Sequence, residues 1–244
     1  MIAITFDIDW SPDTIVDDVI AVLDAYKIPA TLFCTNFTKD NSGNSSSLIG
    51  RVHERHEIAL HPDFQYVENY AMEWDELLTL YPAAKGWRSH NGMSGWPIMK
   101  GAMNRGLRYE VFSSVFSDYV APCQVNRALP DYHVYTTAFW DSHMLHATEF
   151  SWTFDDIPLR NLFQDDDKIV VLGFHPNILY YDMRTINEYD VRKPSYHAVD
   201  AKSSFHRRKP LGAMKLMLEL AEAVPQKHFT TLSAFGAMVG LWQR

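Results

Sequence analysis

The chain has few cysteines, no excess of basic residues and no long apolar run. Two cysteines in 244 residues, Cys34 and Cys123, are too few for a disulfide framework. With 22 basic and 30 acidic side chains the net charge is −8, so the basic face that a nucleic-acid-binding protein needs is missing. No stretch approaches the roughly 20 apolar residues that cross a bilayer. We therefore expect no nucleic-acid partner and no transmembrane segment.

The start of the sequence also lacks the succession of basic, apolar and small residues that marks an export leader. We therefore expect a cytoplasmic protein. No linker divides the chain, and its 47% hydrophobic and 14% aromatic content is typical of a folded globular protein. The expectation is one domain over residues 1–244, and the sequence carries no signal for an oligomeric state.

Residues 2–10 (IAITFDIDW) predict the first strand. Side chains alternate along a strand, so Ile4 and Phe6 lie on one face while Asp7 and Asp9 share the other. Carboxylates near the end of so apolar a strand carry a desolvation cost unless a cation or hydrogen bonds meet them. The ordinary alternative is that the two aspartates stand where the strand reaches water.

Strand-like runs alternate with helical patterns along most of the chain. After the first strand, the expected strands are residues 30–37, 56–60, 84–88, 109–116, 133–140 and 169–174. This alternation is typical of a parallel sheet and predicts an α/β fold, a distorted barrel of seven or eight β/α units. Residues 177–210 are expected to be irregular, and residues 228–232 to form a short strand.

Polar side chains follow several of these strands. In order they are Asp9, His61, Arg88, His90, Asp141, His143 and His175. The carboxyl ends of parallel strands converge on one face, so these groups are expected to gather there. Carboxylate and imidazole ligands from separate strands are typical of a catalytic divalent metal, with Zn²⁺ preferred over Mg²⁺ or Ca²⁺. His56 is expected to be structural because the strand direction points it away from His61.

These segments resemble the motifs of the polysaccharide deacetylase family with the NodB homology domain, carbohydrate esterase family 4. Residues 5–9 (TFDID) take the place of the TFDDG motif, and residues 56–61 (HEIALH) that of the lead-in and first metal histidine. Residues 88–92 (RSHNG) correspond to the arginine motif, and residues 140–141 and 172–175 to the last two. The resemblance covers about residues 3–176 and implies a distorted, incomplete (β/α) barrel.

Two positions depart from the family pattern. Ile8 stands where a metal-binding aspartate belongs, and Gln65 stands where the second metal histidine belongs. Asp9 and His90 are the candidates to replace them. The His-Pro after the third strand and the Arg-Ser-His are similar to a branch of deacetylase-like proteins associated with lipopolysaccharide O-antigen synthesis.

The resemblance implies a role for each site residue. The expected metal ligands are Asp9, His61 and His90, with His175 as the alternative third ligand. Asp7 would be the general base, Arg88 would orient that carboxylate, and His175 would protonate the departing amine; Asp7 and Asp9 could exchange roles. The expected substrate is an N-acetylated sugar or polysaccharide precursor, and a nucleotide- or lipid-linked form stays open.

Two other functions also stay open. One is a pseudoenzyme that binds carbohydrate because the departed metal residues are not replaced. The other is an unrelated barrel metallohydrolase acting on a small amide or a phosphoester. The basic cluster at residues 206–209 (HRRK) is expected to be a solvated face, or else to contact the phosphate of a linked sugar.

Overall fold

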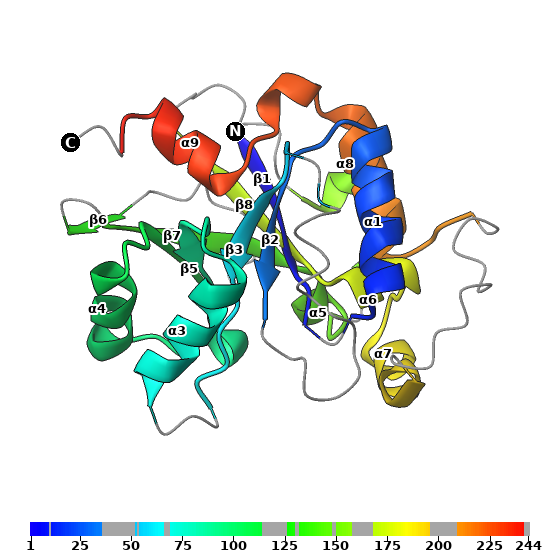
Figure 1. Cartoon of the computed structure of the whole chain (residues 1–244). Coiled ribbons are helices and arrows are strands. Elements are labelled where there is room, and N and C mark those ends of the chain that lie inside the picture. Colours follow the sequence, from blue (N-terminus) through cyan, green and yellow to red (C-terminus); the bar gives the residue numbers. More distant parts are fainter. Residues whose placement is uncertain are drawn as a thin grey trace.

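A computed structural model of the chain describes residues 1–9, 11–35, 52, 54–65, 69–113, 126–129, 132–147, 150–157, 168–195 and 209–241. Figure 1 shows a central sheet with helices arranged around it. Some predicted features lie outside the described residues: Cys123, residues 36–37 and 114–116 of two expected strands, and residues 206–208 of the basic cluster.

The strands form a closed barrel, as predicted. They are β1 (Ile2–Asp7), β2 (Ala30–Cys34), β3 (Glu57–Leu60), β4 (Gly86–Trp87), β5 (Tyr109–Ser113), β6 (Asn126–Leu129), β7 (Tyr132–Trp140) and β8 (Val170–Phe174). Seven of them pair in parallel in the order β1-β2-β3-β4-β5-β7-β8, with β8 returning to β1. The pairing of β5 with β7 closes the barrel, and β6 is added to β7 in antiparallel direction.

Both faces of β1 are buried, which explains its apolar sequence. Ile4 and Phe6 belong to the large core between the sheet and the helices, whereas Ala3 belongs to a smaller core inside the barrel. Leu232 and Phe235 of helix α9 (Leu232–Met238) close the interior from the end at which the strands begin. The strands finish at the opposite end, away from α9 (Figure 1).

Among the described residues, the other helices lie around the sheet (Figure 1). They are α1 (Asp13–Ala25), α3 (Tyr70–Leu80), α4 (Trp96–Asn104), α5 (Asp141–Met144), α6 (Pro176–Tyr180), α7 (Ile186–Arg192) and α8 (Ala213–Ala223), with short 3₁₀ turns η1 (His90–Gly92), η2 (Phe154–Asp156), η4 (Lys193–Ser195) and η5 (Gln226–His228). None of the helices described has the length and hydropathy needed to cross a membrane.

Two expectations about secondary structure were wrong. Residues 177–210 are not all irregular, because α6, α7 and η4 lie within them. The start of α7 had a signal in the sequence, since Thr185 accepts a hydrogen bond from the Glu188 amide at 3.3 Å in a Thr-x-x-Glu pattern. The strand expected at 228–232 is reduced to one bridge between Phe229 and Ile2, because the α9 helix begins at Leu232.

Candidate active site

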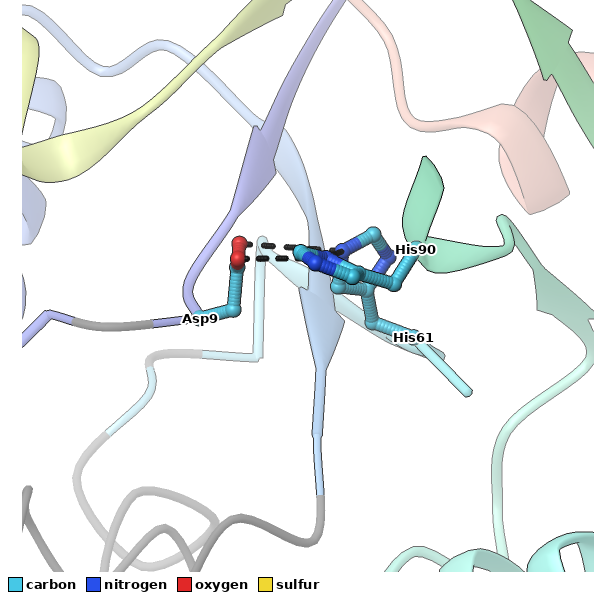
Figure 2. A group of neighbouring side chains, drawn as sticks. All are labelled: Asp9, His61 and His90. Carbon is cyan, nitrogen blue, oxygen red and sulfur yellow. Dashed lines mark hydrogen bonds and ion pairs between the residues drawn. The ribbon is translucent and has the colours of Figure 1, made fainter. Parts of the chain in front are cut away.

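The three predicted metal ligands meet at the carboxyl end of the barrel. Asp9 follows β1, His61 follows β3 directly, and His90 begins η1 just after β4. Figure 2 shows the carboxylate of Asp9 pointing at both imidazoles. One ligand atom from each residue lies within 4.8 Å of the other two. The fold thus brings together side chains from three separate strand ends.

The spacing of these atoms matches a metal site. Asp9 Oδ2 lies 3.2 Å from His90 Nδ1, His90 Nδ1 lies 3.4 Å from His61 Nε2, and His61 Nε2 lies 3.6 Å from Asp9 Oδ1. Ligands bonded to a tetrahedral Zn²⁺ at about 2.0–2.1 Å are about 3.4 Å apart. The three separations therefore have the size that a shared divalent ion requires.

The hydrogen bonding of His61 supports the same conclusion. Its Nδ1 lies 2.7 Å from the carbonyl oxygen of Arg88, which can only accept, so Nδ1 carries the proton. Burial lowers the pKa of His61 more than the Asp7 and Asp9 carboxylates raise it, so the ring is neutral and Nε2 presents a lone pair. Asp9 Oδ1 is buried and accepts no hydrogen bond from the described residues. Two facing acceptors are unfavourable unless a cation lies between them, so these residues fit a divalent metal.

The two residues that depart from the family pattern lie elsewhere. Ile8 is packed in the large hydrophobic core. Gln65 is exposed, and its Oε1 accepts a hydrogen bond from Asn91 Nδ2 at 2.9 Å. Neither Ile8 nor Gln65 therefore contributes a ligand to the candidate site, whereas Asp9 and His90 both lie there.

Asp7 lies beside this group but has a different partner. Arg88, which is 1% exposed, donates to Asp7 Oδ1 from Nε at 2.7 Å and from Nη2 at 2.5 Å, and from Nη1 to Thr5 Oγ1 at 2.9 Å. The guanidinium is held between two rings, 4.0 Å from the centroid of Phe33 and 4.4 Å from that of Trp140. This arrangement fixes the position and orientation of the Asp7 carboxylate next to the three predicted ligands.

His175 pairs with Asp141, which the sequence analysis placed at the same end of the barrel but gave no role in the reaction. Its Nδ1 lies 2.7 Å from Asp141 Oδ1, and its backbone N–H donates to Asp141 Oδ2 at 2.7 Å. Burial by itself lowers the pKa of His175, but the Asp141 carboxylate raises it by a larger amount, so the pKa lies at about 9. The imidazole is therefore protonated at neutral pH, and it is outside the three-residue metal group. The sequence feature that could have indicated a role for Asp141 is its position in the motif at residues 140–141.

The Trp140 ring rests directly on the backbone of β8 because residue 173 is glycine. A Cβ at Gly173 would lie 2.8 Å from Trp140 Cε3 and 2.9 Å from Cδ2. We expect Gly173→Ala to lower the free energy of unfolding by about 1–3 kcal/mol and to reduce activity, because the displaced ring no longer holds Arg88. Urea denaturation measures the first effect, and an unchanged midpoint would contradict this account of the packing.

The comparisons with known proteins agree with the predicted family and with the barrel fold. The family model described as WbmS-like polysaccharide deacetylase matches residues 4–193. A comparison with curated protein sequences finds no significant match.

Among solved structures, a candidate polysaccharide deacetylase involved in O-antigen biosynthesis in Bordetella bronchiseptica superposes with a TM-score of 0.73 at 24% identity, over 91% of this chain and 90% of that one. A candidate polysaccharide deacetylase from Mycobacterium smegmatis gives a TM-score of 0.53 at 18% identity, over 94% and 91%. A pseudoenzyme of carbohydrate esterase family 4 from Bacillus anthracis gives 0.50 at 9% identity, over 96% and 64%. At these identities the superpositions support the barrel fold.

Proposed function

The chain belongs to the WbmS-like polysaccharide deacetylase family, and from that premise we propose that it is a metal-dependent deacetylase that hydrolyses the acetamide of an N-acetylated sugar or polysaccharide precursor. The observation that carries this proposal is the group formed by Asp9, His61 and His90, with donor atoms at ligand spacing. Asp7, whose carboxylate is held by Arg88, and a protonated imidazole, His175, accompany it. Family membership also argues against an unrelated barrel hydrolase.

In this proposal Asp9, His61 and His90 hold the ion, and Zn²⁺ suits their mixed oxygen and nitrogen donors. When bound, a divalent ion supplies Lewis-acid catalysis, which activates water at neutral pH and polarises the acetyl carbonyl. The chain's own contribution is then to place the base, the acid and the substrate.

Two separate side chains carry out the proton transfers in this proposal. Asp7, held by Arg88, takes a proton from the attacking water as the new C–O bond forms. His175 gives a proton to the sugar nitrogen as the C–N bond breaks, so the products are acetate and a free amine. The Nδ1 of His175 is engaged by Asp141, which leaves Nε2–H as the proton donor.

The direct test is acetate release from a panel of N-acetylated sugars. Protein loaded with Zn²⁺ is expected to release acetate, to lose this activity when a chelator removes the metal, and to regain it when Zn²⁺ is returned. Metal analysis is expected to find about one ion per chain. A protein that binds Zn²⁺ but releases no acetate from any substrate would contradict the proposed activity.

A carbohydrate-binding pseudoenzyme is the second candidate, and two observations favour it. Ile8 and Gln65 occupy positions where the family pattern has metal ligands. A solved pseudoenzyme also shares the fold. This candidate predicts saturable sugar binding that is unaffected by chelators and accompanied by no acetate release, so the same assays separate the two functions.

The pH dependence of the reaction tests the pair formed by Asp141 and His175. A pKa of about 9 for His175 keeps it in the acid form at neutral pH. Asp141→Asn removes the negative charge that favours the imidazolium, so the pKa of His175 falls and the alkaline limb of the kcat/KM profile moves to lower pH. The matched control is Asp75→Asn, which removes an exposed carboxylate paired with Arg105 and is expected to leave the profile unchanged. Superimposable alkaline limbs for Asp141→Asn and the unaltered protein would exclude His175 as the acid.

A further inference from the structure

A large groove lies on the outside of the barrel, away from the candidate active site. Its volume is about 1010 Å³, and residues of α1, α6, α7 and α8 line it. Figure 1 shows α1 beside α6 and α8, with α7 below them. None of the described lining residues is a proposed ligand or catalytic group. The volume is at the upper end of the range for small-molecule sites, which is about 300–1,000 Å³.

The walls of the groove are largely apolar and partly exposed. Ala21 and Ala25 present small exposed side chains one turn apart on α1, so little side-chain volume projects into the groove from this wall. Val191 and Leu211 on the rim are 78% and 55% exposed, unusually high fractions for large aliphatic side chains in a folded chain. An apolar ligand of extended shape would cover these surfaces.

The groove is also locally positive in a protein whose net charge is −8. Its charged lining consists of three cations and two carboxylates: Arg184, Arg192, Lys209, Asp182 and Glu188. Glu188 is neutralised by Arg184, whose Nη2 lies 2.6 Å from Oε1.

The carboxylate of Asp182 is occupied in a different way. It accepts hydrogen bonds from the backbone N–H groups of Gly212 and Met214, at 2.8 and 3.0 Å, where α8 begins. No carboxylate in the described part of the chain forms an ion pair with Arg192 or Lys209. Arg192 is kept at the groove by the ring of Tyr181, whose centroid is 5.1 Å from the guanidinium carbon. Two cations are thus left to face a ligand.

We propose that this groove binds an anionic amphiphile, a molecule with one apolar chain and a phosphate headgroup. The apolar chain of this ligand lies against the alanines of α1 and the apolar side chains of α8, and its phosphate contacts Arg192 and Lys209. Arginine and lysine are the side chains that bind phosphate best, and the apolar walls give the chain its affinity. The occupant is a single molecule taken from solution, and the site is independent of the proposed deacetylase activity.

Isothermal titration with monomeric dodecyl phosphate tests the proposal. We expect one molecule to bind per chain. The charge-reversal variant Arg192→Glu/Lys209→Glu and the groove-filling variant Ala21→Trp are each expected to weaken binding about tenfold or more. Ala237→Trp places the same large side chain at an exposed position of α9 outside the groove, and is expected to leave affinity unchanged. Thermal unfolding of each variant verifies that it is folded.

Three outcomes would overturn the inference. Equal binding of inorganic phosphate would show that the groove does not recognise the alkyl chain of the ligand. Equal binding of neutral dodecyl maltoside would show that it does not recognise the phosphate. Binding to phosphatidic acid vesicles without binding of monomeric dodecyl phosphate would assign the surface to a membrane instead. Because these titrations do not depend on acetate release, failure of the amphiphile site and failure of the proposed activity are distinguishable.

Discussion

Replacing His61 with alanine is expected to abolish stoichiometric metal binding and to reduce acetate release by about a thousandfold or more. The imidazole presents a lone pair that a backbone carbonyl holds in place, through the 2.7 Å contact between Nδ1 and the Arg88 oxygen. Loss of a ligand removes the several kcal/mol that a Lewis acid contributes to the transition state, and each 1.36 kcal/mol is a factor of about ten. Metal analysis and initial rates measure the two effects.

The matched control is His56→Ala, which removes another buried histidine from the same part of the chain. His56 Nδ1 accepts a hydrogen bond from the Ala30 amide at 3.2 Å, and its Nε2 lies 3.3 Å from Asp24 Oδ1. We expect this variant to unfold more easily yet to retain one metal ion per chain and most of the activity. If His61→Ala also kept its metal and its rate, the proposed ligand set would be wrong.

The second large effect is expected for Asp7→Asn, which should reduce kcat by about 10²–10⁴-fold while the metal is retained. Asp7 is held by Arg88 and is not one of the three predicted ligands, so the amide removes the base and leaves the ligands in place. Asp9→Asn is expected to lose both metal and activity, because Asp9 Oδ1 lacks a hydrogen-bond donor among the described residues and faces a histidine lone pair. Comparing metal content and kcat in the two variants assigns the two carboxylates.

Asp7→Asn also leaves the buried Arg88 charge without its partner, which typically costs about 3–5 kcal/mol of stability. Thermal unfolding therefore accompanies the kinetics, and Asp7→Glu provides a variant that keeps the charge but displaces the carboxylate. Retained metal with lost kcat in both Asp7 variants would support the base. Loss of metal in Asp7→Asn together with full metal retention in Asp9→Asn would reverse the assignment.

Much of the fold could be predicted because it follows from local patterns. The apolar run of β1 and its alternation identified a strand buried on both sides, with Asp7 on the face opposite Phe6. The polar groups at strand ends could also be identified, since parallel strands all finish at one face. Short elements were harder: residues 228–232 look like a strand by composition, but Thr231 caps a helix there, with its Oγ1 3.2 Å from the Ala234 amide.

The sequence by itself determined the barrel class and the set of polar residues that face its carboxyl end, because both depend on periodicity and on the order of strands and helices. Only the tertiary structure decided which of those residues pair with one another and which three lie together. Arg88 engages Asp7 and Asp141 engages His175, whereas Asp9, His61 and His90 lie together as the proposed metal group. These pairings join residues far apart in the chain, and their distances depend on how β5 meets β7 to close the barrel. Sequence spacing carries no measure of that closure, so the proposed roles rest on pairings that only the folded structure shows.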